Sequence, residues 1–96
     1  MSDAPSFSDD DRPAIAPPFR FQWEEAQQAY VLLYPEGMVT LNDSAGEILR
    51  RCDGTRTVTT LLQELRSDFP DADLGADVRG FLEEAYEHGW IRAADA

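Results

Sequence analysis

The sequence has no lysine, a single cysteine, a single histidine and no long hydrophobic run. Its eight basic residues are all arginines, set against nineteen Asp and Glu, so the 96-residue chain has a formal net charge of −11. Nucleic acids and anionic membranes attract proteins through basic residues, so this balance argues against both as partners. The acid excess indicates either a solvated surface or attraction of a basic partner, and charge alone does not decide between them.

The lone cysteine, Cys52, cannot form a disulfide within the chain. No charged segment followed by an apolar one opens the sequence, and no apolar stretch reaches 18 residues, so we expect a soluble cytoplasmic protein. Cys52 falls on an apolar helical stripe, which favours a small core residue. The alternative is a reactive thiol, which would need a nearby cation such as Arg50 or Arg51.

Residue patterns that build active sites are scarce. There is no Cys or His pair at metal-ligand spacing, no Gly-rich phosphate loop and no Ser nucleophile motif. The only histidine, His88, lies at the end of a predicted helix, where its ring suits the negative end of the helix dipole. We therefore expect a protein that is not an enzyme and that uses no metal and no cofactor.

The first half of the chain is predicted to form an arm and three strands. Residues 1–18 hold four prolines and four aspartates without a hydrophobic period, which predicts a flexible acidic arm. Apolar and polar residues alternate over Phe19–Glu24, as in a half-buried strand. The apolar run Ala29–Tyr34 indicates a central strand covered on both faces. A tight turn over Tyr34–Gly37 leads to a short strand, Met38–Leu41, and such short connections favour an antiparallel meander.

The hydrophobic period changes to that of helices after Leu41. Ser44 and Glu47 match a capping box at the start of a first helix, and its apolar stripe is Ala45, Ile48, Leu49 and Cys52. Thr57 is expected to cap a second helix, whose stripe is Val58, Leu61, Leu62, Leu65 and Phe69. A third helix is predicted from about Asp73 to His88, with the stripe Leu74, Val78, Phe81, Leu82 and Ala85.

The predicted fold is α+β, with a three-stranded antiparallel meander followed by three helices in an arrangement like a winged helix-turn-helix. The folded domain is expected over residues 19–92, with a short tail over 93–96. Winged helices commonly bind DNA, which makes a transcription regulator the alternative function. Such a regulator would need a basic recognition helix, whereas Arg66 and Arg79 stand among acidic residues.

The strand Met38–Leu41 is expected at an edge of the sheet, and it carries neither charge nor proline. Proteins normally block such edges, so an unblocked one favours the addition of an extended peptide as a further strand. The alternatives are that the helices cover the edge or that its shortness protects it, and pairing with a second copy in a homodimer also stays open.

A basic cluster follows this strand in the sequence and consists of Arg50, Arg51 and Arg56. These arginines would make charge contacts with carboxylates on an incoming peptide. Alternatively, they pair with acidic residues of their own helix such as Glu47.

The order and spacing of several segments resemble the pyrroloquinoline quinone biosynthesis protein D (PqqD) family. The resemblance spans about residues 19–92, and the segments that carry it are Phe21–Glu24, Gln28–Gly37, Leu41–Leu49, Cys52–Gly54, Asp77–Leu82 and Gly89–Ile91.

This resemblance implies a peptide chaperone without catalytic activity, of the kind called a RiPP recognition element. Such proteins bind a PqqA-like precursor peptide, whose glutamate and tyrosine become the cofactor, and present it to a PqqE-like radical-SAM enzyme. Related domains receive the peptide as a strand over a groove lined by the third helix. The residues implied for peptide binding are Met38, Val39, Thr40, Leu41, Val78, Phe81, Leu82 and Ala85.

Overall fold

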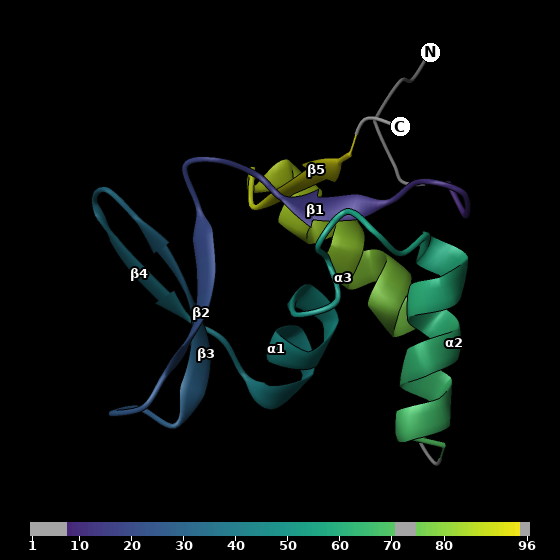
Figure 1. The fold of residues 1–96 in the computed structure, drawn as a ribbon, viewed down its shortest axis with the longest axis horizontal. Helices are drawn as coiled ribbons and strands as arrows, with labels where there is room; N and C mark the ends of the chain where they lie inside the picture. The colour runs from purple at the N-terminus through teal and green to yellow at the C-terminus, as the bar shows by residue number, and fades with distance from the viewer. Residues whose placement is uncertain (1–7, 71–74, 95–96) are drawn as a thin grey trace.

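Two small antiparallel sheets accompany three helices in the computed structural model, which describes residues 8–70 and 75–94 (Figure 1). The predicted α+β fold, with its meander followed by three helices, is confirmed. The elements in chain order are β1 (Pro13–Ile15), β2 (Arg20–Glu24), β3 (Ala29–Tyr34), β4 (Gly37–Thr40), α1 (Asp43–Leu49), α2 (Val58–Asp68), α3 (Gly75–Glu87) and β5 (Ile91–Ala93).

The three-stranded sheet has the order β2-β3-β4, so the apolar run Ala29–Tyr34 is its central strand as predicted. Val31 and Leu32 are neighbours that point to opposite faces of the sheet, and both are fully buried. The strand is therefore covered on both faces at its middle. The two residues Pro35 and Glu36 connect β3 to β4, since Tyr34 pairs with Gly37.

A second sheet, formed by β1 and β5, was not predicted. Pro13 pairs with Ala93 and Ile15 with Ile91, so the expected arm over residues 1–18 is wrong for residues 13–15. Proline is tolerated at the first position of a short edge strand. Three residues are too few to show a hydrophobic period, and this strand depends on partners that lie far away in the sequence.

The segment before β1 also belongs to the folded part of the chain. The backbone N–H groups of Val58 and Thr59 donate to the carbonyl oxygens of Asp11 and Asp9, at 3.0 and 3.2 Å. These N–H groups open α2 and have no acceptor within the helix, so residues 9–11 satisfy them. Residues 1–7 of the predicted arm and residues 95–96 of the predicted tail lie outside the described residues.

The helix starts agree with the sequence in one case and differ in another. Thr57 caps α2 as predicted, its hydroxyl accepting from the N–H of Thr60. Helix α1, however, is capped by Asn42, whose Oδ1 accepts from the N–H of Ala45 at 2.8 Å, so the capping box at Ser44 is wrong. Asn is as good a cap as Ser, and it starts the helix two residues earlier. The predicted start of the third helix near Asp73 lies outside the described residues.

The hydrophobic core is formed by the inner face of the sheet, the helices and β5. Its buried residues are Leu32, Leu41, Ala45, Ile48, Leu49, Cys52, Val58, Leu61, Leu62, Leu65, Val78, Leu82, Ala85 and Ile91. Most predicted stripe residues are among them, but Phe81 is only half-buried and Phe69 is 41% exposed. Phe69 marks the larger departure from the prediction. It lies just after the last turn of α2, where the helical period no longer fixes the direction of a side chain.

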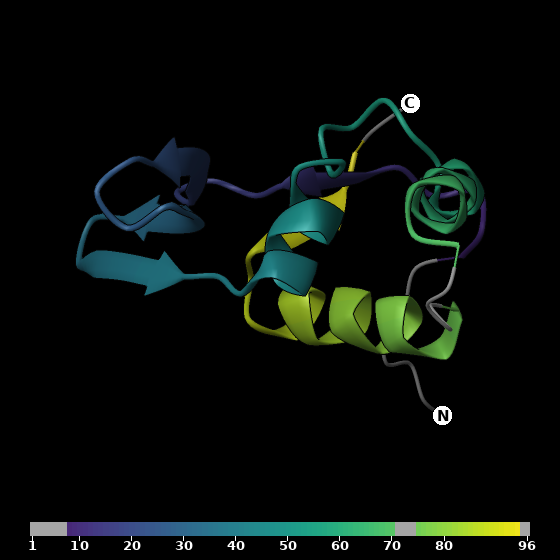
Figure 2. The ribbon, with the colours of Figure 1, turned by 90° about the horizontal axis from the view of Figure 1, so that it is seen from below.

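The sheet extends to one side of the helices and meets them at α1 (Figure 2). The contact is close because Gly46 of α1 has no side chain: a Cβ atom there would lie 2.8 Å from Cδ2 of Tyr30. The Tyr30 ring also stacks on Phe21, with ring centroids 4.8 Å apart, and meets Trp23 edge-on at 5.0 Å. One aromatic side chain of the central strand thus joins the sheet to the helical layer.

We expect Gly46→Ala to lower the free energy of unfolding by about 1–3 kcal/mol, because the added methyl group would overlap the Tyr30 ring near its fixed end. Urea unfolding followed by circular dichroism measures this change. The matched control is Gly80→Ala in α3, where a Cβ atom meets nothing within 4 Å and the gain in helix propensity should stabilise by about 0.5–1 kcal/mol. Equal effects of the two substitutions would contradict the close-contact explanation.

Candidate peptide-binding edge

The strand β4 borders the sheet on the side of α3 (Figure 2). The N–H of Leu41 donates to the carbonyl of Tyr30 at 3.0 Å, which fixes the phase of the hydrogen-bond ladder. In an antiparallel pair, alternate residues turn their backbone groups toward the partner strand and away from it. Gly37, Val39 and Leu41 therefore face β3, whereas Met38 and Thr40 direct their N–H and C=O groups outward.

No strand of the described ranges 8–70 and 75–94 pairs with this outer border of β4. The backbone groups of Met38 and Thr40 also take part in none of the loop and turn hydrogen bonds of those ranges. The N–H and C=O groups of Met38 and Thr40 thus offer two donors and two acceptors along one edge, which is the arrangement that an added β-strand requires.

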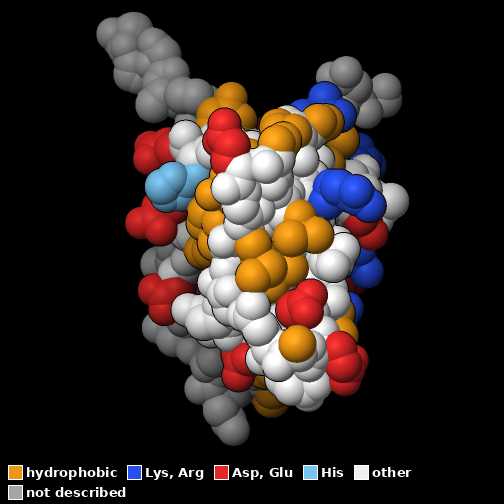
Figure 3. All heavy atoms as spheres, turned by 90° about the vertical axis from the view of Figure 1, so that its left-hand side faces the viewer, with side chains coloured by type: hydrophobic (Ala, Val, Ile, Leu, Met, Phe, Trp, Pro, Cys, Tyr) orange, Lys and Arg blue, Asp and Glu red, His pale blue; other side chains and the backbone are white. Residues whose placement is uncertain are grey.

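The side chains of β4 divide between the two faces of the sheet. Val39 lies opposite Leu32 and packs half-buried against the core. Met38 lies opposite Leu33 on the other face and is 41% exposed. Figure 3 looks onto this side of the molecule and shows hydrophobic side chains gathered at its middle. Leu41, which follows the strand, is buried, so the side chains of Met38 and Val39 offer more apolar contact than Leu41 does.

Thr40 is exposed, and its hydroxyl donates to the side-chain oxygen of Gln27 at 3.0 Å. This contact links the end of β4 to the β2–β3 turn.

The α3 residues implied by the resemblance lie mostly inside the protein. Leu82 and Ala85 are buried in the core, and Phe81 is half-buried. Val78 is also buried, but it lines a hollow between the helices. Helix α3 lies on the side of the sheet where β4 has its open border (Figure 2), and of these four residues only Phe81 is less than fully buried.

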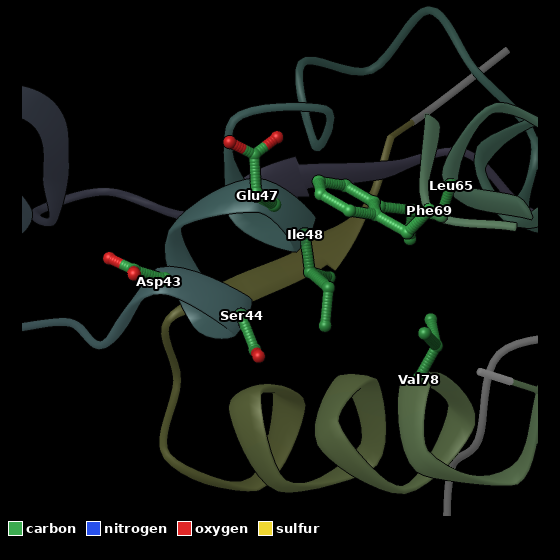
Figure 4. Close-up of a pocket in the computed structure, with 7 residues that line it drawn as sticks. All are labelled: Asp43, Ser44, Glu47, Ile48, Leu65, Phe69 and Val78. Atoms are coloured by element: carbon green, nitrogen blue, oxygen red, sulfur yellow. The ribbon is translucent and has the colours of Figure 1, made fainter. Parts of the chain in front are cut away.

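The hollow lies between α1, α2 and α3 and has a volume of about 170 Å³. Ile48 from α1 and Val78 from α3 point into it from opposite sides, and the Phe69 ring bounds it at the end of α2 (Figure 4). The described residues that line it are Asp43, Ser44, Glu47, Ile48, Leu65, Phe69 and Val78. We call it the interhelical recess.

A second, larger hollow of about 350 Å³ shares a border with the interhelical recess. It is also lined by Asp43, Glu47 and Phe69, and it extends to Trp23 and Tyr30 near the β2–β3 turn. Phe69 continues the apolar period of α2, so the sequence pattern predicts a buried side chain there and not the wall of a hollow. Phe69 directly precedes Pro70, and a helix usually ends before such a position, so the sequence does indicate that Phe69 can leave the helical stripe.

The arginines of the basic cluster form ion pairs with acidic residues of the same chain. Arg51 is only 3% exposed. Its guanidinium donates to Glu47 at 2.9 Å, to Glu64 at 3.3 Å and to Asp68, so it ties the end of α1 to α2. A buried arginine with this set of acceptors has little capacity left for a carboxylate on a peptide.

The other two arginines of the cluster are also paired. Arg50 donates to Glu47 at 3.1 Å, and Arg56 contacts Asp53 at 3.0 Å and Glu64 at 2.9 Å. The alternative of pairing within their own helix is therefore confirmed for Arg50 and Arg51, which both contact Glu47, whereas Arg56 pairs with acidic residues outside that helix. Arg50, Arg51 and Arg56 are therefore not among the proposed peptide contacts.

Cys52 is buried in the core, and its Sγ lies 3.4 Å from the carbonyl of Ile48. Burial, together with the negative charge of Asp53, raises the pKa of its thiol to about 12. The interpretation of Cys52 as a core residue is confirmed, since a thiol in this state is unreactive near neutral pH. His88 stacks on Trp90 after α3, with ring centroids 4.8 Å apart.

The described face of α3 is acidic, with Asp77, Glu83, Glu84 and Glu87 exposed. Its arginine, Arg79, pairs with Asp9. The structure thus adds nothing in favour of a DNA-binding helix. Within the described part of the chain, no helix has the length and apolar character needed to cross a membrane.

The family profile of Coenzyme PQQ synthesis protein D (PqqD) matches residues 29–91, which run from the start of the central strand to the start of β5. The chain belongs to the PqqD family. The match includes β4, α1, α2 and α3, and it leaves out β1 and β2.

Two curated relatives extend the similarity to this family. The chain is 52% identical over 82 residues to the PqqA binding protein of Azotobacter vinelandii, covering 84% of this chain and 89% of the relative. It is 47% identical over 78 residues to the PqqA binding protein of Methylococcus capsulatus, covering 81% and 84%. Both relatives are thus named for binding PqqA.

A solved structure shares the PqqD-family fold. It is the solution NMR structure of the PqqD truncation of Methylobacterium extorquens PqqCD, described as a functional and stand-alone RiPP recognition element. The TM-score is 0.70 with 30% sequence identity, over 91% of this chain and 95% of the solved one.

The ion pairs of Glu47 predict how stability depends on pH. Hydrogen bonding to Arg51 lowers the pKa of Glu47 below its ordinary value of 4.5. A lowered pKa in the folded state stabilises the protein above the unfolded-state pKa, and this contribution is lost as the pH falls through the folded-state value. We expect Glu47→Gln to destabilise by about 1 kcal/mol at pH 7, and the difference from wild type to shrink below about pH 4.5.

Urea unfolding between pH 3 and 7 measures this dependence. Glu83→Gln is the control, because Glu83 is exposed on α3 and has no ion pair within the described residues. A constant difference between wild type and Glu47→Gln over the whole pH range would contradict the assignment.

Proposed function

We propose that this chain binds a PqqA-like precursor peptide as an added β-strand on β4 and presents it to a PqqE-like radical-SAM enzyme. The observation that carries the proposal is the outward direction of the backbone groups of Met38 and Thr40 on an uncharged border. The names of the relatives, which specify PqqA binding, supply the peptide.

The border of β4 gives such a strand both hydrogen bonds and apolar contact. An extended peptide would exchange up to four backbone hydrogen bonds with residues 38 and 40. Each contributes a net free energy of about 0.5–1.5 kcal/mol, so a few of them with modest apolar burial support micromolar binding. Met38 on the outer face and Val39 on the inner face are placed to contact alternate side chains of the peptide.

Presentation to an enzyme fits the position of the edge. The sheet extends away from the helices, so an added strand would lie at the border of the molecule rather than in a deep cleft (Figure 2). The parts of the peptide beyond the strand would stay accessible to a second protein. The solved relative is described as a functional and stand-alone recognition element, which supports a chain that acts as a binding module.

Replacing Thr40 with proline tests the edge directly. Proline removes the outward N–H of residue 40, and a side of the strand without a partner tolerates this loss. We expect Thr40→Pro to keep the fold and to weaken binding of a synthetic PqqA-type peptide at least tenfold. Isothermal titration calorimetry measures the affinity, and circular dichroism verifies the fold.

Two matched variants separate the possible causes. Thr40→Val removes the hydroxyl contact with Gln27 but keeps the N–H, so binding should stay within about twofold of wild type. Val39→Pro removes an N–H that faces β3 and should destabilise the sheet itself. Unchanged peptide affinity in Thr40→Pro, with the fold intact, would refute binding through this edge.

A further inference from the structure

Phe69 is one of three large hydrophobic side chains left exposed in the described part of the chain, together with Trp23 and Met38. It lies at the rim of the interhelical recess, not over a filled core, and its ring faces α1 across the opening (Figure 4). An aromatic side chain held beside an open hollow is half-solvated, and a guest in the hollow would remove it from water.

The interior of the recess suits an apolar group. Ile48, Leu65 and Val78 are all buried in the core cluster and present their hydrocarbon side chains to the hollow. An apolar cavity of about 150 Å³ is large enough to hold benzene. A recess of about 170 Å³ therefore has room for one aromatic or branched aliphatic side chain.

The recess lies where a strand on β4 would lead. Strand β4 runs toward α1, and only Leu41 and Asn42 separate its last residue from that helix (Figure 2). Ser44 and Ile48 of α1 face α3 across the recess, on the side where β4 has its open border (Figure 4). An antiparallel strand on β4 would direct its N-terminal end into this space.

The acidic residues at the rim of the recess affect which charge is favoured on the peptide beside the inserted side chain. Glu47 is neutralised by Arg50 and Arg51, whereas Asp43 takes part in none of the ion pairs found in the described ranges. A carboxylate next to the inserted side chain would meet the charge of Asp43 without compensation. A neutral or basic neighbour is therefore favoured.

We propose that the interhelical recess binds one bulky apolar side chain of the precursor peptide, from residues adjacent to the strand paired with β4, and that Phe69 is a residue that determines this specificity. The proposal rests on the proposed function, because it places the guest on the same peptide. The edge of β4 supplies backbone hydrogen bonds, and the recess selects the peptide by one side chain.

The test compares peptide affinity in variants of the whole chain. We expect Phe69→Ala to raise the Kd of a synthetic full-length PqqA-type peptide about tenfold, because part of the wall around the guest is removed. Phe69→Leu keeps an apolar wall and should restore most of the affinity. Gln63→Ala, at an exposed position of α2 outside the lining, is the matched control and should leave the Kd unchanged.

A second measurement follows the wild-type protein by NMR during the same titration. We expect the Ile48 methyl signals to shift together with the backbone amides of Met38 and Thr40. If those amides shift while the Ile48 methyls stay in place and Phe69→Ala keeps wild-type affinity, the recess is not a peptide site and the edge proposal stands. If the amides of β4 do not respond to the peptide, the proposed function fails, and this inference fails with it.

Discussion

The contact between Tyr30 and Gly46 determines where the sheet lies relative to the helices. Tyr30 belongs to the central strand, stacks with Phe21, meets Trp23 edge-on, and packs against a helix position that has no Cβ. Its carbonyl also accepts from the N–H of Leu41, at the point where β4 gives way to α1. The position of the β4 border beside α3 and the interhelical recess therefore follows from the packing of one side chain.

Arg51 has the corresponding role within the helical layer. A buried guanidinium is costly unless carboxylates surround it, and Glu47, Glu64 and Asp68 do so. These contacts hold α1 against α2, which are two walls of the recess. In a chain with few basic residues, using Arg51 in this way fixes the geometry of the helices and leaves the peptide to be bound mainly by backbone and apolar groups.

Sequence patterns predicted those elements whose stability is local. The strand Ala29–Tyr34 could be predicted because a hydrophobic run is recognisable from a few residues. The same holds for the capping side chain of Thr57. Pro13–Ile15 was missed because its hydrogen bonds go to β5, far away in the sequence. Phe69 continued the helical period of α2, but the helix ends before it, and only the three-dimensional structure shows that its ring borders a hollow.

The candidate site could be predicted only in part for a related reason. The uncharged border at Met38 and Thr40 is visible in the sequence, because charge and proline are the usual means of blocking an edge. A border of this kind forms hydrogen bonds with the peptide backbone, which is the same in every peptide. By itself it therefore cannot select one peptide sequence. Leu82 and Ala85 are buried in the core and offer no pocket for a guest. Selection by side chains therefore has to come from surface that stays open beside the edge, and Phe69 at the recess provides apolar surface of that kind.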